Sequence, residues 1–544
     1  MPKGRLHMSE NWIKMTIFAG EITKSDMRKI MKKLIKNVVL ATALTAVSAE
    51  VNAGLAFDPT KGTEGKMEMY DGSEVKYRAF EKLYYVENVE DSTYQYLNVY
   101  VPEGATQKTP IFLRTYVGGY MASAASQPQA GDASGRALKE GYVVVIPGTR
   151  GRNSTIVADK AYSKAHKGVK NGETVWTGRA PKAIIDLKAA VRYLRHFDAV
   201  MAGDAERIVT DGTSAGGAMS SLLGATGNNP LYEPYLDAMG AAKERDDVFA
   251  SVCYCPIIDL EHADMAYEWV YGGTKSRQGM DESHRTLSAE LAMKYGEYID
   301  GLKMVKPDGS ALTAENYRDY MKEEIIRGAQ IAKNAGAAIP DTLGFEFSQS
   351  VGGMFAAPLN GGMRGSFKPM GGEKKQIPGG RQGMPPLGGQ QGEYITDIDM
   401  ATYLDYVVST QPLKTVPAFD SLIEGVNQGS GENEEFGDDK GSSVNFTEFT
   451  AAKNNSEVTA EVAANVRLMN PMSFLNDANT TVAGHWYIRH GSRDRDTAFP
   501  VPINFATKLR NAGKDVNFLL AWNRPHSGDY ALDELFEWIA EIVK

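Results

Sequence analysis

Residues 207–217 read RIVTDGTSAGG, and this stretch decides the fold. Its first five residues predict a short apolar strand, and the residues from 215 to 223 predict a helix. Between them, GTSAG at 212–216 matches the pattern G-x-S-x-G, placed where a strand turns sharply into a helix. Such a turn exposes the serine oxygen, and the helix N-terminus directs N–H groups at developing negative charge. Ser214 is therefore a candidate nucleophile, and the alternative is an ordinary glycine-rich turn.

The sequence on either side of this turn alternates between strands and helices. Strands are expected at 94–101, 110–116, 141–146, 248–257, 485–488 and 516–522, and helices at 181–196 and 531–543. The run GYVVVI at 141–146 has the continuous β-branched character of a strand that is buried on both faces, as in a parallel sheet. We therefore predict an α/β fold, with a mostly parallel sheet and helices on both of its faces.

The alternation of strands and helices is interrupted once, between about residues 259 and 469. We interpret residues 259–469 as a large lid domain, inserted into a catalytic domain that consists of residues 50–258 and 470–544. Within the lid, residues 352–392 contain 13 glycines and 5 prolines. This composition predicts a flexible loop.

The N-terminal part has the organisation of a secretory signal. A basic run precedes the apolar stretch VVLATALTAVSA at 38–49, whose last residues are small enough for a signal peptidase to cut. Residues 51–53 offer a second cleavage point. We therefore interpret residues 1–49 as an N-terminal extension and signal peptide, with the signal beginning at about Met27. We therefore expect an exported protein, either periplasmic or extracellular. The alternative is that the apolar stretch at 38–49 forms a short buried helix.

Composition excludes several classes of protein. The chain has 544 residues, 42% of them hydrophobic and 23% charged, so it can form a sizeable core. Its net charge of −9 disfavours a nucleic-acid partner, because general nucleic-acid binders carry a basic excess. No apolar run reaches the ~20 residues of a membrane span, and we expect no membrane anchor. Cys253 and Cys255 are too few for a disulfide scaffold, and we expect both in the core on one face of a strand.

A serine nucleophile on such a turn needs an Asp or Glu and then a His, in that chain order. Asp494 and His526 meet this requirement, since each follows a predicted strand near the C-terminus. The carboxyl ends of strands are where α/β sheets place their sites. We predict that Ser214 attacks an ester carbonyl, that His526 accepts and later returns the proton, and that Asp494 holds the imidazole tautomer. Structural roles are expected for the other histidines of the mature chain: His166, His196, His262, His284, His485 and His490.

The oxyanion of the tetrahedral intermediate needs two backbone N–H donors. One is expected from Ala215, directly after the nucleophile, and the other from Gly118 or Gly119, in the turn that follows the predicted strand at 110–116. Losing one such donor typically costs ~100-fold or more in rate. This chemistry requires no cofactor and no metal, so we predict neither.

The chain resembles the bacterial tannases, which are α/β-hydrolases that cleave galloyl esters. The resemblance covers most of the mature chain, and its most specific pieces are TGRAP at 177–181, GTSAGG at 212–217, KTVPAFD at 414–420, ENEEFG at 432–437 and DRD at 494–496. It implies an α/β-hydrolase fold and a serine esterase that hydrolyses galloyl bonds of tannins and simple gallates. Gallic acid would be released through an acyl-enzyme intermediate, and the partner would be a small aryl ester.

The resemblance also implies a galloyl pocket formed by Lys414, Glu432 and Asp496. Carboxylates are strong acceptors for the O–H groups of a trihydroxyphenyl ring, and a lysine can hydrogen-bond a phenolic oxygen. As alternatives, Asp496 caps a turn, Lys414 lies in a solvated loop, and Glu432 belongs to a solvated acidic loop or, more remotely, a calcium site. The acidic residues that crowd Glu432 are Glu434, Glu435, Asp438 and Asp439.

Three other functions compete with this interpretation. A feruloyl or general carboxylesterase on the same fold would show no dependence on Lys414, Glu432 or Asp496. A peptidase of the prolyl-oligopeptidase kind usually has an N-terminal propeller, for which the residues before the first predicted strand leave no room. A binding module that has lost its catalytic residues is disfavoured, because the serine, aspartate and histidine are all present at suitable positions.

Overall fold

The computed structural model describes residues 54–349, 393–423 and 429–544. The predicted signal peptide and the glycine- and proline-rich stretch at 352–392 lie outside the described residues.

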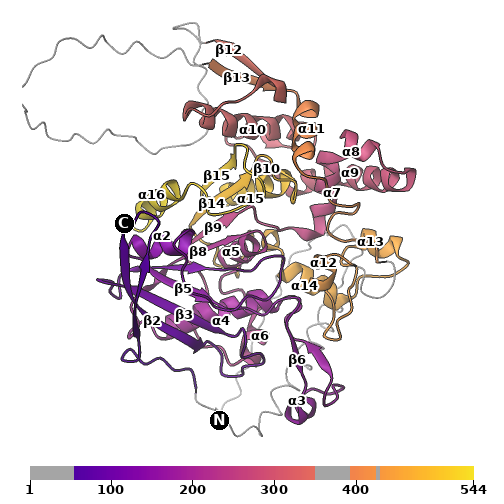
Figure 1. The fold of residues 1–544 in the computed structure, drawn as a ribbon. Helices are drawn as coiled ribbons and strands as arrows, with labels where there is room; N and C mark the ends of the chain where they lie inside the picture. The colour runs from indigo at the N-terminus through magenta and orange to yellow at the C-terminus, as the bar shows by residue number, and fades with distance from the viewer. Residues whose placement is uncertain (1–53, 350–392, 424–428) are drawn as a thin grey trace, which may run out of the picture.

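A nine-stranded sheet forms the centre of the molecule, in the order β1-β2-β3-β5-β4-β8-β9-β14-β15 (Figure 1). The strands are β1 (Thr63–Glu68), β2 (Glu74–Tyr84), β3 (Tyr96–Pro102), β4 (Pro110–Arg114), β5 (Val143–Pro147), β8 (Asp204–Thr213), β9 (Ala250–Tyr254), β14 (His485–Gly491) and β15 (Asp515–Ala521). The pairs from β1 to β5 are antiparallel, and all pairs from β5 to β15 are parallel. The prediction of a mostly parallel α/β sheet is confirmed.

Helices cover both faces of the sheet. Alternate residues of β5 divide between two cores, since Val143 and Val145 belong to one hydrophobic cluster and Val144 and Ile146 to the other. This division follows from the two-residue period of a strand. The helices on the first face are α4 (Lys182–His196), α5 (Ala215–Ala225) and α15 (Pro500–Asn511), and those on the second are α2 (Ala133–Lys139) and α16 (Leu532–Ile542).

The two N-terminal strands, β1 and β2, were not among the predicted elements. Their sequences, TEGKME and EVKYRAFEKLY, are rich in charged residues, and Phe80 is the one buried residue among them. They form the antiparallel edge of the sheet, where charged side chains are common. A search for apolar runs therefore passes over them.

The chain between β9 and β14 adds no described strand to the nine-stranded sheet. Figure 1 shows its helices gathered on one side of the sheet. Its larger helices are α7 (Leu260–Tyr271), α9 (Glu282–Leu302), α10 (Tyr317–Asn334), α11 (Met400–Thr410) and α14 (Ala460–Leu468). Its shorter elements are α8 (Lys275–Gln278), β10 (Met304–Val305), β11 (Ala311–Leu312), β12 (Phe345–Gln349), β13 (Glu393–Ile398), α12 (Gly431–Glu435) and α13 (Glu448–Lys453).

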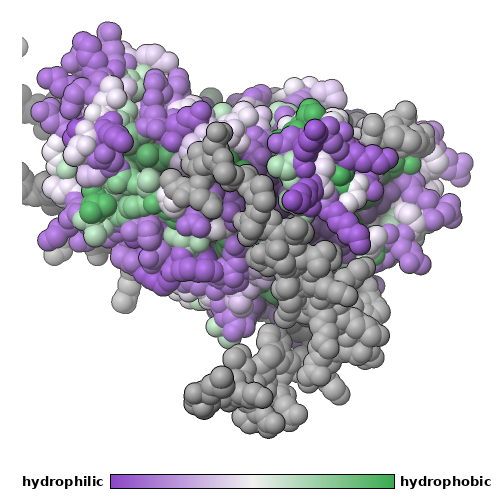
Figure 2. All heavy atoms as spheres, turned by 90° about the horizontal axis from the view of Figure 1, so that it is seen from below, coloured by the Kyte–Doolittle hydropathy of each residue, from purple (hydrophilic) through white to green (hydrophobic). Residues whose placement is uncertain are grey.

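The surface seen in Figure 2 is mostly hydrophilic, with smaller hydrophobic areas between hydrophilic ones. Scattered apolar residues of this kind are usual on protein surfaces. Within the three described ranges, no helix combines the length and the apolar character that a membrane crossing requires.

Candidate active site

Ser214 lies on a strained turn between β8 and α5. Its backbone has φ 63° and ψ −123°, a conformation that residues other than glycine rarely adopt. Gly212 allows this turn, because a Cβ atom there would lie 2.2 Å from the carbonyl oxygen of Gly216. The Ser214 N–H donates to the carbonyl of Tyr254 in the neighbouring strand, at 3.0 Å. The backbone thus holds the serine at the carboxyl edge of the sheet.

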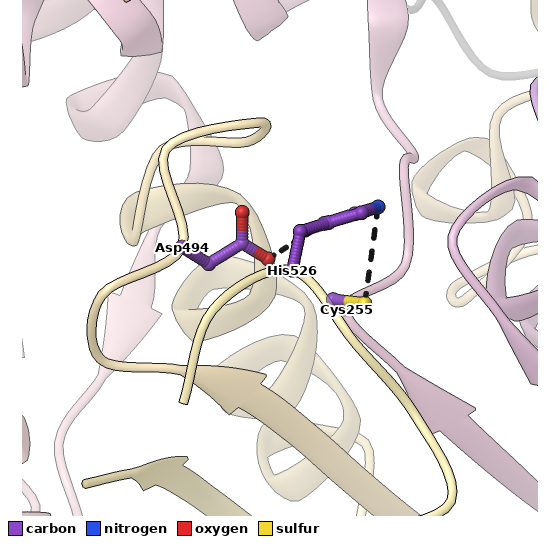
Figure 3. Close-up of side chains that lie close together, drawn as sticks. All are labelled: Cys255, Asp494 and His526. Carbon is purple, nitrogen blue, oxygen red and sulfur yellow. Dashed lines mark hydrogen bonds and ion pairs between the residues drawn. The ribbon is translucent and has the colours of Figure 1, made fainter. Parts of the chain in front are cut away.

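The structure brings the three predicted catalytic residues together. Ser214 Oγ lies 2.8 Å from His526 Nε2, and His526 Nδ1 lies 2.7 Å from Asp494 Oδ2. Figure 3 shows the Asp494 carboxylate facing the imidazole of His526. Asp494 lies on the loop after β14, and His526 lies on the loop after β15. Asp494 is fully buried, whereas Ser214 and His526 are partly exposed. A substrate can therefore reach the serine and the histidine while the carboxylate stays away from water.

Electrostatics favour an ionised Asp494 beside His526. Burial disfavours the charged carboxylate, but His490, the hydrogen bond with His526 and the backbone N–H of Asp496 outweigh it and lower the pKa of Asp494. Burial likewise disfavours a charged His526, yet its contacts with Asp494 and Cys255 raise the pKa of the imidazole. The buried carboxylate thus makes His526 a stronger base.

The raised pKa of His526 predicts a loss of activity on the acid side. His526 must be neutral to accept the proton of Ser214, so kcat/KM falls as the pH drops through the pKa of His526. We expect the midpoint of this fall above the ordinary imidazole pKa of about 6.5. Asp494→Asn should move the midpoint downward, because it removes the charge that stabilises the imidazolium. A wild-type midpoint below about 6.5 that Asp494→Asn leaves in place would contradict the assignment.

The predicted oxyanion donors face no competing acceptor. Ala215 is the first residue of α5, and Gly118 and Gly119 are exposed in the turn after β4. This turn packs on the serine turn, since a Cβ at Gly216 would lie 3.0 Å from the carbonyl oxygen of Val117. In the part of the chain that the structure describes, the N–H groups of Ala215, Gly118 and Gly119 donate no hydrogen bond. They remain available for an oxyanion.

His490 is the predicted structural histidine that approaches the triad. It is fully buried on β14, and its Nδ1 lies 3.6 Å from Asp494 Oδ2. Burial lowers the pKa of His490, although the charge of Asp494 opposes this shift. The other five contact local partners, in the pairs His166–Tyr162, His196–Glu244, His262–Asp259, His284–Asp281 and His485–Asp515.

Cys255 departs from its predicted position. The two cysteines are buried, as expected, but the prediction that they share one face of a strand is wrong, because Cys253 belongs to one hydrophobic cluster and Cys255 to the other. Strand β9 ends at Tyr254, and the positive φ of 37° at Cys255 turns its side chain away from the side of Cys253. Its Sγ comes to lie 3.9 Å from His526 Nε2. Burial raises the pKa of the Cys255 thiol, so the thiol is protonated and is not the nucleophile.

Contacts with helix α7 position the segments of the chain that carry Lys414 and Asp496. The Lys414 N–H donates to Tyr267 Oη at 3.1 Å, and Tyr271, one turn further along α7, donates to the carbonyl of Asp494 at 3.2 Å. The Asp496 N–H donates to Asp494 Oδ1 at 2.8 Å, and its carboxylate pairs with Arg495 at 2.9 Å. Helix α7 thus joins the segment of Lys414 to the loop that carries Asp494 and Asp496.

Glu432 lies on the short helix α12, which is connected to the turn after β4 that contains Gly118 and Gly119. Arg152 makes this connection, because its Nε donates to the carbonyl of Gly119 at 2.8 Å while its Nη1 pairs with Glu434. Among the neighbouring acids, Glu435 is buried, and Asp438 and Asp439 are exposed. The described carboxylates of this segment do not converge on a common point, so the calcium alternative gains no support.

Comparisons relate the chain to known proteins. A family model described as BD-FAE matches residues 171–296, and no curated protein matches. The solved tannase of Fusobacterium nucleatum is 32% identical over 91% of this chain and all of its own, with a TM-score of 0.72. The tannin acyl hydrolase of Lactobacillus plantarum is 34% identical over 90% of this chain and 99% of its own, with a TM-score of 0.73. This chain belongs to the bacterial tannase family.

Membership of the tannase family makes the protein an ester hydrolase with the α/β-hydrolase fold. Two solved structures of a tannin acyl hydrolase, each 34% identical to this chain, are described in complex with ethyl gallate and with 3,4-dihydroxybenzoate. One of the sequence motifs that carry the resemblance also makes a structural contact in this chain. TGRAP at 177–181 packs on α12, because the Ala180 N–H donates to the carbonyl of Glu435 at 2.7 Å.

Asp420, the last residue of KTVPAFD, holds together several segments of the chain between β9 and β14. The residue is fully buried, and its carboxylate is a shared acceptor for these segments. Its hydrogen-bond donors are Asn433 Nδ2, Asn445 Nδ2, the N–H groups of Phe446 and Thr447, and the hydroxyls of Thr447 and Thr450. The segment of Lys414 and the helix of Glu432 are thereby held in one unit.

We expect Asp420→Ala to lower the free energy of unfolding by about 3 kcal/mol or more, because it leaves several buried donors without an acceptor. KM for a gallate ester should rise as well, since the segments of Lys414 and Glu432 lose their common anchor. Denaturant unfolding and initial rates measure the two effects. Asp439→Ala, an exposed acid in the same part of the chain, is the matched control. Equal stability of Asp420→Ala and Asp439→Ala would contradict the role of Asp420.

Sequence reasoning missed Cys255, His490 and Arg152 as neighbours of the site. Cys255 carries a usable signal, since it lies at the carboxyl end of a predicted strand that borders the serine turn. Arg152 gives no such signal, because its role depends on a contact with α12 from a distant part of the chain.

Proposed function

We propose that this protein is a secreted serine esterase that hydrolyses the galloyl ester bonds of tannins and simple gallates and releases gallic acid. The observation that carries the proposal is the hydrogen-bonded chain from Ser214 through His526 to Asp494, on a strained turn in a member of the tannase family. The gallate complex of a relative supports the choice of substrate.

The proposed reaction proceeds through an acyl-enzyme. Ser214 Oγ attacks the ester carbonyl while His526 Nε2 accepts its proton, and Asp494 stabilises the imidazolium. The N–H groups of Ala215 and of the Gly118–Gly119 turn stabilise the oxyanion. His526 then protonates the leaving alcohol. In the second half, water attacks the galloyl ester of Ser214 with the same histidine as base, and gallic acid leaves.

Substrate selection is assigned to Lys414, Glu432 and Asp496. All three side chains are partly exposed, and their segments are linked to the catalytic loops through α7 and Arg152. Within the described ranges, the Lys414 ammonium makes no ion pair with a carboxylate and lies 3.7 Å from the ring centroid of Phe419. It is therefore free to bind a phenolic oxygen, and the two carboxylates can accept hydrogen bonds from the ring hydroxyls.

Asp496→Asn tests this pocket separately from the chemistry. The loss of a charged acceptor for a phenolic O–H should lower kcat/KM for methyl gallate by about 10–100-fold. An ester without hydroxyls, such as methyl benzoate, gains nothing from this acceptor, so its low rate should hardly change. Initial rates on both esters measure the effect, and Asp515→Asn, an exposed acid elsewhere, is the control. Equal losses on both esters would show that Asp496 supports the triad and does not bind the galloyl ring.

The competing function is a feruloyl or general carboxylesterase on the same fold. The BD-FAE match covers the serine turn but ends before Lys414, Glu432 and Asp496, so it bears on the catalytic domain only. A preference for methyl ferulate over methyl gallate would favour this alternative.

Export is proposed from the N-terminal sequence alone. We expect the mature protein, recovered from the periplasm or medium of an expressing bacterium, to begin at Glu50 or Gly54. Intact-mass measurement of the secreted and cell-retained fractions checks this. A full-length protein that keeps residues 27–49 and stays in the cytoplasm would contradict it.

A further inference from the structure

We propose that Cys255 and His526 form a binding site for a thiophilic divalent cation such as Zn²⁺ or Cd²⁺, and that this cation switches the esterase off. The inhibitory part of this inference rests on the proposed function, in which His526 is the catalytic base. The binding part rests on geometry alone.

The geometry places two good ligand atoms at a suitable separation. Cys255 Sγ and His526 Nε2 lie 3.9 Å apart, and Figure 3 shows the sulfur directly facing the ring nitrogen. Zn²⁺ binds sulfur at about 2.3 Å and imidazole nitrogen at about 2.0–2.1 Å. A cation at these distances from both atoms has an S–Zn–N angle of about 125°, close enough to tetrahedral to need only a small movement. Cys255, Asp494 and His526 are also the one described group that brings three potential ligand atoms together.

Asp494 makes the imidazole a better ligand without binding the cation itself. Its Oδ2 lies 2.7 Å from Nδ1, so it accepts the Nδ1 proton and leaves the lone pair on Nε2. Histidine ligands in metal sites commonly have such a carboxylate behind the ring, where it fixes the tautomer and raises the basicity. The buried negative charge of Asp494 also favours a cation nearby. Asp494 thus holds the His526 ring in the tautomer and orientation that a metal ligand needs.

Access and coordination are compatible with a small cation. Cys255 is buried, but His526 and Ser214 are partly exposed, so the cation would enter past the ring from the substrate side. Ser214 Oγ, 2.8 Å from Nε2, or water can fill the remaining positions. Binding releases the thiol proton, and the Nε2 proton of any charged imidazole, as H⁺, and the sulfur and Nε2 then each donate an electron pair to the metal. Because Nε2 can no longer accept the proton of Ser214, ester hydrolysis stops.

The chain contains a matched control for this site. Cys253 is also buried, but its Sγ lies beside the Ser221 hydroxyl at 3.2 Å, on the other side of the strand. A thiol at this place has no imidazole partner. Cys253→Ala therefore removes a buried thiol without touching the proposed site.

The experiment is a Cd²⁺ titration followed by the ultraviolet sulfur-to-cadmium charge-transfer absorption. The proteins are wild type, Cys255→Ala, Cys253→Ala and Ser214→Ala. The band should appear with one equivalent of Cd²⁺ in wild type, Cys253→Ala and Ser214→Ala, and be absent in Cys255→Ala. In parallel, Zn²⁺ should inhibit methyl gallate hydrolysis reversibly, with EDTA restoring the rate. Cys255→Ala, measured against its own rate without Zn²⁺, should need at least about 100-fold more Zn²⁺ for half inhibition, because it loses a direct ligand and the loss of a group behind a ligand alone costs about 10–100-fold in affinity.

The outcomes separate this inference from the proposed function. A protein that does not hydrolyse methyl gallate but shows the Cys255-dependent band would refute the proposed function and keep the metal site. An active esterase without the band, or equal Zn²⁺ sensitivity of wild type and Cys255→Ala, would overturn the inference and leave the esterase standing. Should Cys255→Ala fail to fold, Cys255→Ser takes its place, because a hydroxyl preserves the volume and binds Cd²⁺ poorly.

Discussion

Ser214→Ala is expected to lower kcat for methyl gallate by about 10⁵–10⁶-fold, the range seen when a triad nucleophile is removed from a serine hydrolase. The triad acts as a unit, so without Ser214 Oγ the base His526 has no proton to accept and no acyl-enzyme forms. KM should change little, because the groups assigned to ring binding are untouched. Initial rates, together with intact-mass detection of phosphonate labelling, measure both parts.

The control for this substitution is structural. Ser214→Ala keeps the backbone turn, so its unfolding midpoint should match that of wild type. Rates within tenfold of wild type in a folded Ser214→Ala protein, or phosphonate labelling at another residue, would refute the role of Ser214.

Asp494→Asn is expected to lower kcat by about 10⁴-fold, on every ester that the enzyme accepts. An asparagine in this place can present its amide nitrogen to Nδ1 and so favour the wrong imidazole tautomer. His490, 3.6 Å from Asp494 Oδ2, carries no negative charge in either protonation state and cannot take over. Rates on methyl gallate and on p-nitrophenyl acetate measure this loss.

Asp496→Asn is the matched comparison for Asp494→Asn, since the two residues share one loop. Asp494→Asn should depress both substrates equally, whereas Asp496→Asn should depress only methyl gallate. A loss that is confined to methyl gallate in Asp494→Asn would move that residue from the triad to the pocket.

The central part of the fold is predictable because its physical signals are local. The β-branched run now found in β5 identifies a buried parallel strand. The GTSAG turn identifies the point where strand β8 ends and helix α5 begins. Asp494 and His526 follow from the required chain order and from the rule that sites lie at carboxyl ends of strands. The strands β1 and β2 escape because their polar sequences reflect a sheet edge, which a search for apolar runs does not detect.

The substrate side of the site could not be derived from local pattern. Lys414, Glu432 and Asp496 were reached through resemblance, and their placement depends on contacts between distant segments. Asp420 holds several segments between β9 and β14 together through buried hydrogen bonds, and Arg152 links α12 to the turn after β4. Cys255 shows a different limit, because a single positive φ after β9 moves its thiol from the expected side to the catalytic histidine.

The ratio of kcat/KM for methyl gallate to that for methyl ferulate, on the wild-type protein, tests the central claim most directly. A pocket whose polar groups are placed for ring hydroxyls leaves those groups unpaired when a substrate lacks the hydroxyls. We therefore expect a ratio of at least about 100 in favour of methyl gallate. Equal or faster turnover of methyl ferulate would contradict the account, and would make the protein a general or feruloyl esterase with the same serine, histidine and aspartate.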